Sequence, residues 1–498
     1  MRVPLQPPPG IFSDDTTFSK QGQWADGNNI RFWQGKPQTI GGSQLALSTS
    51  LTGVCRNVLA WTQNDGSLII AFGTHSALQV YFAGVLSTIT PAGLGTGTID
   101  SSGSAPGYGS GAYGEGLYST PDSIYYPRTW SLQTWGQTLL ANPRGLGLYQ
   151  WSNNPAVVAV VVTNAPTQIT AILVTPQRQV LALGTKEEVS GDFNPLCIRG
   201  CDLEDLTDWT TAPDNSAFEH ILEGGGGGHI VTARMVGPYV AVWTDTGLYL
   251  GEFLGNPDET YRFDPVASNC GIVGPNAVHV VGQVAYWVSP DGQFRRWTPG
   301  AQPEIIPCPI RTDFAENLDK VQAAKIVAAG VSSFNEVWWH YPDTRDGMEN
   351  SRYVALSLQE GTWFRGQLPR TAAVDAGVAP YPIATTYAGL VYYQEVVGGS
   401  VTYSLTTADQ YIRDASIAYQ VQRYIPDFEE QDGTGYLQLT VRRYPQSDAI
   451  TKGPYTLAEG ATKVDFRASG SIVSMRLSGT GCIRLGKPEI EAIPLGQR

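Results

Sequence analysis

The sequence contains little charge and very little lysine. Charged residues make up 15% of the 498 residues, and only 8 of the 32 basic residues are Lys. Soluble proteins average about 25% charged residues. Arg is enriched and Lys depleted at protein–protein interfaces, because the planar guanidinium makes several hydrogen bonds and stacks on aromatic rings. The bias favours a protein that buries much of its surface in an assembly, with GC-rich codon usage as the alternative explanation.

Long apolar runs and dense cysteine patterns are also missing. The longest strongly apolar run, from Ala156 to Val162, is far shorter than the roughly 20 residues of a membrane-spanning helix. The Pro-rich start, Met1 to Pro9, lacks the apolar core of a signal peptide. The six Cys are scattered, which favours free thiols in a protein assembled in the cytoplasm. We therefore expect neither a membrane span nor a disulfide framework.

The negative charge is unevenly distributed. The net charge is −13, which argues against general adhesion to nucleic acid. From residue 411 onward there are 11 basic and 10 acidic residues, so this part carries +1 and the first 410 residues carry −14. The acidity therefore belongs to the larger, N-terminal part of the chain.

Helical periodicity is almost absent, and turn residues are abundant. The chain has 56 Gly and 10% aromatic residues, a composition typical of a turn-rich β protein. Residues 319–330 are one of the few stretches that fit a helix, and a strand fits them equally well. Elsewhere, short alternating or apolar runs are bounded by Gly, Pro, Asn and Asp, which indicates strands. The sequence therefore predicts an all-β fold.

Short hairpins with aromatic strand ends recur along the chain. Four of them have a strand ending in Trp or Tyr, a Gly turn that supplies positive φ, and a second strand, and residues 139–151 and 337–363 are looser copies. Such repeats at intervals of about 40 residues are typical of propeller blades, and Trp243 and Trp287 lie 44 residues apart. About six units predict an irregular β-propeller-like body, with a two-sheet sandwich of long hairpins as the alternative. The units are residues 60–73, 139–151, 242–251, 286–297, 337–363 and 385–393.

The pattern suggests three regions. Residues 1–50 form an N-terminal arm with docking strands, and residues 51–405 form the propeller-like body. Two Gly-rich stretches interrupt the body, residues 91–121 and the five glycines 224–228. We interpret the first as a linker or a neighbour-binding segment, and the second as a sharply bent loop. Residues 406–498 alternate cleanly and predict a small C-terminal antiparallel β-sandwich that serves in assembly. Its five expected strands are residues 416–423, 436–444, 463–467, 472–477 and 483–490, with Arg413, Arg423, Arg442, Arg476 and Arg484 on the exposed face.

No residue group predicts a catalytic, cofactor or metal site. The sequence has no G-x-S-x-G elbow and no phosphate-binding Gly-Lys-Ser/Thr loop. Cys197 and Cys201 fall at the wide end of zinc half-site spacing, without a second pair nearby except His220 and His229. The acidic loop 202–208 lacks the glycine and terminal Glu of a calcium loop. We expect two thiols on a loop and solvated carboxylates.

Two end segments of the chain contain recognisable motifs. Residues 10–42 contain D-D-T-x-F, W-x-D-G-x-x-I-R-F and G-K-P-x-x-I-G-G, and the C-terminal segments are residues 465–470, 475–477 and 483–486. These segments resemble the tail-hub, or nozzle, proteins of short-tailed bacteriophages, a family also known as packaged-DNA-stabilisation or tail accessory factors. The resemblance covers roughly the first 45 and last 35 residues. Between them, only the propeller-like pattern is shared.

The resemblance implies a virion structural protein and no enzyme. Such proteins form a homo-hexameric ring below the portal and its head–tail adaptor, contact tail fibre or spike and needle proteins, and enclose the channel through which double-stranded DNA leaves. The chain would be assembled in the host cytoplasm and located in the tail, with no cofactor or small-molecule substrate. We hypothesise that the acidic first 410 residues line the channel, since negative charge repels phosphate. The near-neutral end would then join the assembly.

Two alternatives from other classes remain. A propeller-type enzyme that degrades polysaccharide needs clustered acids and aromatics, and Glu336 with Trp338 and Trp339 is the best candidate group. A monomeric carbohydrate-binding module would instead use exposed Trp and Tyr. A depolymerisation assay tests the first alternative, and the mass of the assembled particle separates both from a ring.

Overall fold

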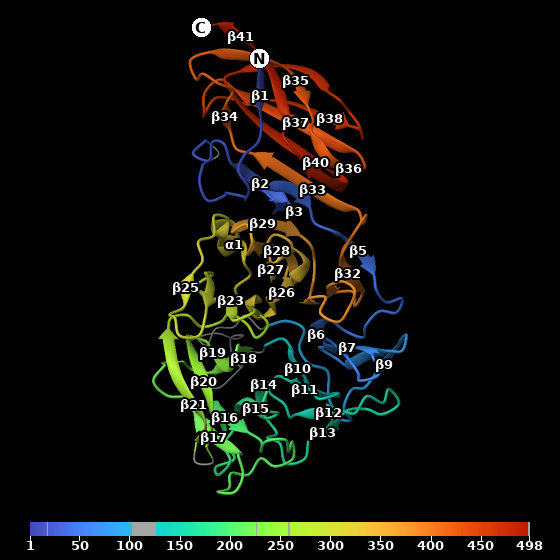
Figure 1. The fold of residues 1–498 in the computed structure, drawn as a ribbon, viewed down its shortest axis with the longest axis vertical. Helices are drawn as coiled ribbons and strands as arrows, with labels where there is room; N and C mark the ends of the chain where they lie inside the picture. The colour runs from blue at the N-terminus through green and yellow to red at the C-terminus, as the bar shows by residue number, and fades with distance from the viewer. Residues whose placement is uncertain (17, 102–125, 226, 257–258, 497–498) are drawn as a thin grey trace, which may run out of the picture.

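The computed structural model describes residues 1–16, 18–101, 126–225, 227–256 and 259–496. Within these ranges the only α-helix is α1 (Arg311–Asn317), accompanied by the 3-10 turns η1 (Ala323–Lys325) and η2 (Ser332–Phe334). All other regular structure is β-strand, arranged as a propeller below a sandwich in Figure 1. The predicted all-β, propeller-like fold is confirmed.

The body consists of seven four-stranded antiparallel sheets in the described residues. The first strand of each sheet contacts the first strand of the next, and the ring closes from the seventh sheet back to the first. These sheets are therefore blades around a common axis, with the first strands innermost. Side-chain clusters fill the spaces between neighbouring blades.

The blades follow the chain in order. Blade 1 comprises β6 (Cys55–Thr62), β7 (Leu68–Thr74), β8 (Leu78–Phe82) and β9 (Val85–Thr88). Blade 2 comprises β10 (Trp130–Trp135), β11 (Thr138–Pro143), β12 (Tyr149–Trp151) and β13 (Val160–Val161). Blade 3 comprises β14 (Ile169–Val174), β15 (Val180–Lys186), β16 (Phe193–Gly200) and β17 (Phe218–Ile221). Blade 4 comprises β18 (Ile230–Val236), β19 (Tyr239–Thr244), β20 (Gly247–Asn256) and β21 (Glu259–Ser268).

Blades 5 to 7 complete the ring. Blade 5 comprises β22 (Val278–Val281), β23 (Val284–Val288), β24 (Phe294–Trp297) and β25 (Glu304–Ile305). Blade 6 comprises β26 (Val327–Val331), β27 (Glu336–Pro342), β28 (Asn350–Ser357) and β29 (Thr362–Gln367). Blade 7 comprises β30 (Ala372–Val374), β31 (Ile383–Thr385), β32 (Val391–Val396) and, from the N-terminal arm, β5 (Gly42–Leu45).

The predicted aromatic hairpins fall in six of these blades. Blade 3 lies outside the pattern, because neither strand of its first hairpin, β14 (ITAILV) and β15 (VLALGTK), contains an aromatic residue. Residues 319–330, for which helix and strand fitted equally, contain η1 and the start of β26. Most of the Gly-rich stretch 91–121 lies outside the described residues, and with it Tyr108, Tyr113 and Tyr118, on which the neighbour-binding interpretation depends.

The arm closes the propeller. β5 pairs antiparallel with β32, with Tyr392 opposite Leu45 and Tyr393 opposite Gln44. Blade 7 therefore takes its outer strand from residues about 350 positions earlier in the chain, and β5 leads directly into blade 1. This arrangement joins the two ends of the propeller through backbone hydrogen bonds, which leaves no gap in the ring.

Above the propeller, two sheets pack face to face and form a sandwich with both chain termini at its far end (Figure 1). One sheet has the order β1-β41-β35-β39, and the other has β2-β33-β40-β37-β38 with β3, β4, β34 and β36 attached. The first sheet contains β1 (Arg2–Pro4), β35 (Ala418–Ile425), β39 (Val464–Gly470) and β41 (Glu489–Gly496). The second contains β2 (Trp24–Asn28), β3 (Ile30–Trp33), β4 (Lys36–Thr39), β33 (Val401–Thr407), β34 (Gln410–Tyr411), β36 (Phe428–Asp432), β37 (Gly435–Arg442), β38 (Ile450–Leu457) and β40 (Ile472–Leu485).

The sandwich differs from its expected outline in two ways. The expected strands 472–477 and 483–490 are incorrect as separate units, because β40 runs unbroken through 14 residues and the last strand begins at Glu489. Gly479, in the middle of β40, lies against the Tyr403 ring, and an added Cβ there would be 2.7 Å from the Tyr403 hydroxyl. The expected boundary at 405/406 falls inside β33.

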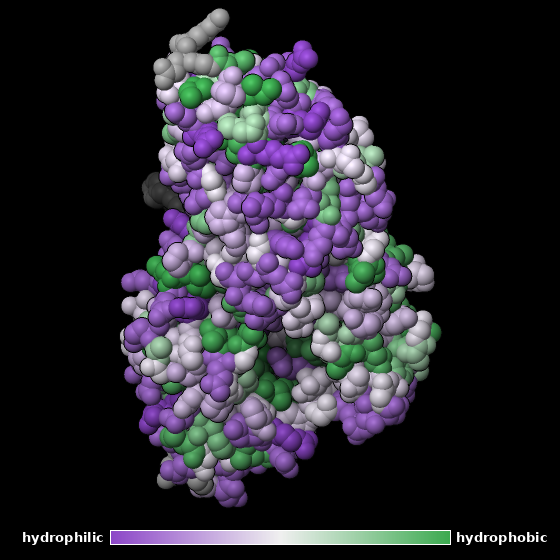
Figure 2. All heavy atoms as spheres, turned by 45° about the horizontal axis from the view of Figure 1, so that its top comes forward, coloured by the Kyte–Doolittle hydropathy of each residue, from purple (hydrophilic) through white to green (hydrophobic). Residues whose placement is uncertain are grey.

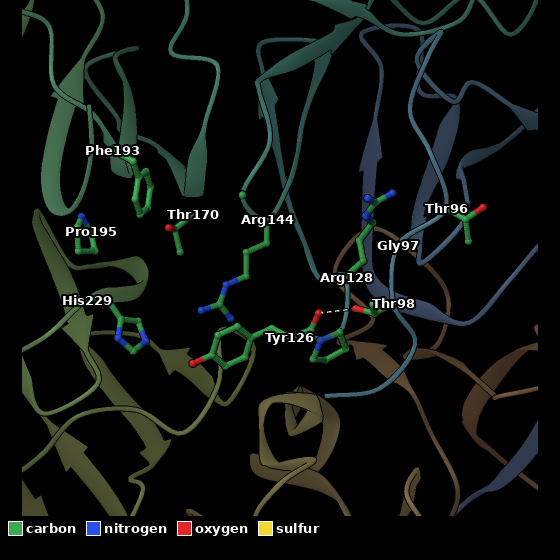
Figure 3. Close-up of a pocket in the computed structure, with 12 residues that line it drawn as sticks. Thr96, Gly97, Thr98, Tyr126, Arg128, Arg144, Thr170, Phe193, Pro195 and His229 are labelled. Carbon is green, nitrogen blue, oxygen red and sulfur yellow. Dashed lines mark hydrogen bonds between the residues drawn. The ribbon is translucent and has the colours of Figure 1, made fainter. Parts of the chain in front are cut away.

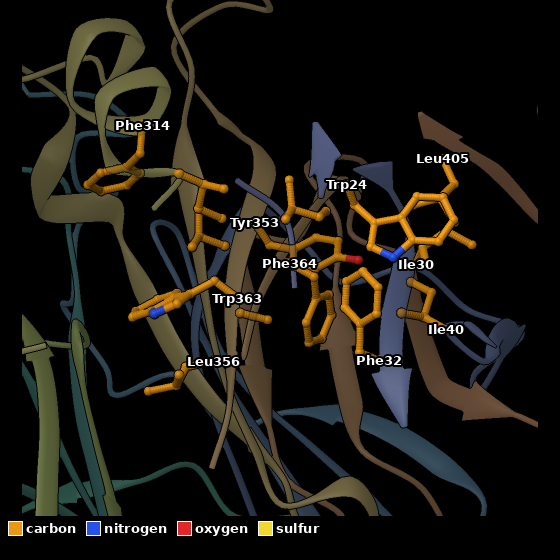
Figure 4. Packing of buried hydrophobic residues seen from close by; sticks show 14 of the residues in the cluster. Trp24, Ile30, Phe32, Ile40, Phe314, Tyr353, Leu356, Trp363, Phe364 and Leu405 are labelled. Carbon is orange, nitrogen blue, oxygen red and sulfur yellow. The ribbon is translucent and has the colours of Figure 1, made fainter. Parts of the chain in front are cut away.

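A single hydrophobic cluster runs from the sandwich into blades 4 to 6. Figure 4 shows Trp24, Ile30 and Phe32 from the arm beside Tyr353 and Phe364 from blade 6. Trp338 stacks on Tyr353 with ring centroids 4.2 Å apart. Because apolar burial is continuous across the junction, the propeller and the sandwich are held as one unit.

Candidate functional site

Glu336, the acid of the enzyme alternative, lies in a fully buried ion-pair cluster. It is the first residue of β27, and its Oε2 accepts hydrogen bonds from Arg31 Nη2 at 3.0 Å and Trp338 Nε1 at 2.8 Å. Arg31 Nη1 donates to Glu395 Oε2 at 2.6 Å, and the guanidinium lies 3.7 Å from the Phe334 ring centroid. The Arg31 and Glu336 side chains have no exposed surface. The cluster therefore joins the arm to blades 6 and 7.

This environment shifts the ionisation of Glu336. Burial, opposed by Arg31, raises its pKa to about 7. A raised carboxyl pKa is typical of general acids, but a general acid also needs hydrogen-bond reach to a substrate. Trp338 and Trp339 are buried as well, at 4% and 0% exposure. The three residues of the enzyme alternative thus form a structural junction that a polysaccharide chain cannot reach.

The two thiols and the acidic loop considered as metal ligands have other contacts, and the expected loop position of Cys197 is incorrect, because it lies in strand β16. Cys197 and Cys201 are buried, and burial raises the pKa of each to about 12. Cys201 Sγ accepts a hydrogen bond from Val180 N at 3.2 Å. In the loop 202–208, Asp202 and Asp205 accept hydrogen bonds from nearby backbone amides. Among the described residues, no group of three or more His, Cys, Asp or Glu side chains could hold a metal ion.

A cavity of about 570 Å³ opens where blades 2, 3 and 4 meet (Figure 3). Arg128 and Tyr126 precede β10, Arg144 follows β11, Thr170 lies in β14, and His229 precedes β18. Phe193 and Pro195 of β16 form an apolar wall, and Thr96, Gly97, Thr98, Pro127 and Gly145 complete the lining. Most of these residues lie at the ends of strands, because turns between strands are where a propeller exposes variable side chains.

The cavity contains positive charge in an acidic body. Arg144 has its guanidinium 4.4 Å from the Tyr126 ring centroid, and within the described ranges no carboxylate forms an ion pair with it. Arg128 Nη1 donates to the Gly95 carbonyl. Burial lowers the pKa of His229, which leaves its ring neutral at pH 7, and Asp245 Oδ2 lies 3.7 Å from its Nδ1. In Figure 3 the Arg144 guanidinium points toward Tyr126 and His229.

Only one feature of the sequence points, indirectly, to this cavity. The glycine run 224–228, interpreted as a sharply bent loop, leads into His229. A Cβ on Gly225 would lie 2.1 Å from the Tyr249 hydroxyl, and one on Gly227 would lie 2.5 Å from Thr244 Oγ1. Close backbone approach thus requires glycine at both positions. Arg144 follows a Pro at a strand end and has no distinguishing pattern.

An apolar edge is exposed on blades 1 and 2. β13 is the outer strand of blade 2. Four valines in this strand and just before it are 44–61% exposed, namely Val157, Val158, Val160 and Val161. Val85 of β9, the outer strand of blade 1, is 61% exposed. The two outer strands are linked where Ala159 N donates to Ile89 O at 2.9 Å. Exposed apolar groups on an open strand edge are typical of contact surfaces.

Of the five arginines expected on the exposed face of the sandwich, three form ion pairs and two are exposed to solvent. Arg423 pairs with Asp465 and Glu491, Arg442 with Asp409, and Arg484 with Glu429. Arg413 and Arg476 are exposed. Figure 2 shows this half of the molecule covered mainly by hydrophilic residues, whereas the propeller half is hollowed at its centre with hydrophobic residues around the hollow.

The chain matches no protein-family model and no curated protein. No helix among the described residues is long and apolar enough to span a bilayer.

Proposed function

We propose that this chain is a structural subunit of the tail of a short-tailed bacteriophage, where it forms a nozzle ring below the portal and adaptor. In this role the ring encloses the packaged DNA, retains it and serves as its ejection channel. The chain would be one of six copies and would contact the adaptor ring, fibre or spike proteins and the needle.

The observation that carries this proposal is the meeting of the two end segments that resemble nozzle proteins. Residues 10–42 supply β2 to β4 and the start of β5, and residues 465–486 supply parts of β39 and β40. Although more than 400 residues separate them, Gln38 of β4 pairs with Arg484 of β40. The motifs of residues 10–42 and 475–486 thus meet in one sheet of the sandwich and at the junction beneath it, and residues 465–470 lie in β39 of the facing sheet.

Three further features support a structural role. The continuous cluster at the junction makes the chain a rigid unit, as a channel wall under load requires. The exposed valines of blades 1 and 2 provide a lateral contact surface. The net charge of −14 in the first 410 residues would repel DNA from a channel wall.

Cryo-electron microscopy of virions that contain this protein tests the proposal. Six copies around the tail axis below the adaptor are the expected result. A peripheral position, as a spike or fibre, would contradict it and would favour a carbohydrate-active tail protein. In that case a depolymerisation assay of wild type against Glu336→Gln is the next measurement, and the burial of Glu336 predicts equal results for the two.

A further inference from the structure

We propose that the cavity between blades 2, 3 and 4 is a binding site for an acidic sugar, with Arg144 as the residue that holds the sugar carboxylate. The proposal is independent of the tail role. It rests on three properties of the cavity: a guanidinium that pairs with no carboxylate of the described residues, hydroxyl oxygens with free acceptor capacity, and an apolar wall.

The charge of the cavity suits a single carboxylate. Arg144 is half-buried and has only the Tyr126 ring as a partner among the described residues. Guanidinium groups bind carboxylates through paired, charge-assisted hydrogen bonds. The neutral His229 adds no charge, and Asp245 beside it opposes a second negative charge. Arg128 also lines the cavity, but its guanidinium donates to the Gly95 carbonyl, whereas no described oxygen accepts from the Arg144 guanidinium. With Asp245 opposing a second negative charge, a monoanion fits better than a phosphate dianion.

The hydroxyls suit a ligand that donates hydrogen bonds. Thr98 Oγ1 donates to Tyr126 O at 2.6 Å, and Thr170 Oγ1 donates to Gly184 O at 3.2 Å. With their protons committed, both oxygens can only accept. Sugar hydroxyls supply such donors, whereas the carboxylate of a protein side chain does not. Phe193, which is 40% exposed, and Pro195 offer an apolar wall to the C–H face of a sugar ring.

The cavity volume is consistent with this class of ligand. Small-molecule sites typically occupy about 300–1,000 Å³, are lined by apolar groups and contain a few polar groups. At about 570 Å³, the cavity accommodates one or two sugar units. Its opening between blades lets a longer chain continue outside.

Saturation-transfer NMR and calorimetry on the full chain test the proposal, with methyl glucuronoside as the probe. Methyl glucoside, acetate and inorganic phosphate are the comparison ligands. We expect the glucuronoside to bind at least ~10-fold more tightly than each of them, because only it offers both a carboxylate and sugar hydroxyls. Absence of glucuronoside binding, or equal binding of phosphate or acetate, would overturn the assignment.

Two variants locate the site. Arg144→Gln should weaken glucuronoside binding at least ~10-fold and leave glucoside binding unchanged. Arg178→Gln is the matched control, since Arg178 also lies over an aromatic ring, Trp135 at 5.4 Å, but lines no part of the cavity. Phe193→Ala changes an exposed side chain and should weaken both sugars without affecting folding. Wild-type binding by Arg144→Gln or by Phe193→Ala would overturn the proposed placement.

Discussion

At the scale of single residues, the junction depends on one buried cation. Arg31 is the only partner of opposite charge that the structure gives to Glu336 and Glu395 among the described residues. Removing one member of a buried ion pair leaves an uncompensated charge, which costs more than the pair contributes. Arg31→Met should therefore lower the free energy of unfolding by about 3–5 kcal/mol, measured by chemical denaturation with Trp fluorescence.

Lys36→Met is the matched control for that variant. Lys36 lies in the same arm and also pairs with a distant glutamate, Glu429 at 3.0 Å, but both side chains are 39–48% exposed. Solvent screens such a pair, so the loss should not exceed about 1 kcal/mol. Equal effects of the two substitutions would show that burial of Arg31 does not control the junction.

Glu336 should also make stability depend on pH. Its pKa is about 7 in the folded protein, raised by burial, against an ordinary value of 4.5. Between these values the folded state holds a proton that the unfolded state has released, so stability falls as pH rises from 4.5 to 7. Relative to Glu336→Gln, wild type should lose up to about 3 kcal/mol across this window. A constant difference between the two proteins from pH 4.5 to 7 would contradict the proposed titration.

At the scale of elements, closure of the propeller depends on β5. Gly42 lies opposite Val396, and a Cβ added to it would be 2.3 Å from the Gly399 Cα, a backbone atom that cannot move aside easily. Gly42→Ala should destabilise the protein by about 1–3 kcal/mol, as overpacking usually does. Gly95→Ala has open space around the new methyl group and should stay within about 0.5 kcal/mol of wild type. Thermal unfolding measures the stability of the two variants. Equal midpoint temperatures would show that β5 is not tightly packed at Gly42.

The exposed edge strand β13 provides a test of assembly. Val161 is 61% exposed, so Val161→Lys should leave the fold of the single chain intact while placing a charge on the proposed contact surface. We expect this variant to fail to form rings in the presence of the adaptor, observed by negative-stain microscopy. Val189→Lys is the control, because Val189 is 97% exposed on a different blade. Normal ring formation by Val161→Lys would exclude β13 from the subunit contact.

At the scale of the whole molecule, the charge distribution predicts weak interaction with DNA. The body carries −14 and the chain −13, so counterion release offers no gain on contact with phosphate. We expect no retardation of double-stranded DNA in gel-shift experiments even at about 50 mM salt, where electrostatic binding is strongest. A salt-sensitive shift would contradict an acidic channel wall.

The sequence by itself determined the local elements, because a hairpin needs only neighbouring residues. Trp243 before a Gly turn and Trp287 before another define β19–β20 and β23–β24 without reference to the rest of the chain. Blade 3 lies outside the aromatic pattern, since its first hairpin, β14 and β15, has no aromatic residue. Alternation likewise predicted β35, β37 and β39, whose side chains are buried and exposed in turn.

Only the tertiary structure decided what joins residues far apart in the chain. Nothing near Gly42 indicates that it pairs with residue 396, and nothing near Glu336 indicates that Arg31 lies 3.0 Å away. A catalytic carboxylate and a buried structural one look alike in sequence, since their difference is solvent access. The cavity around Arg144 could not be predicted for the same reason. Its lining residues come from three blades, and their positions in the sequence do not show that these blades meet.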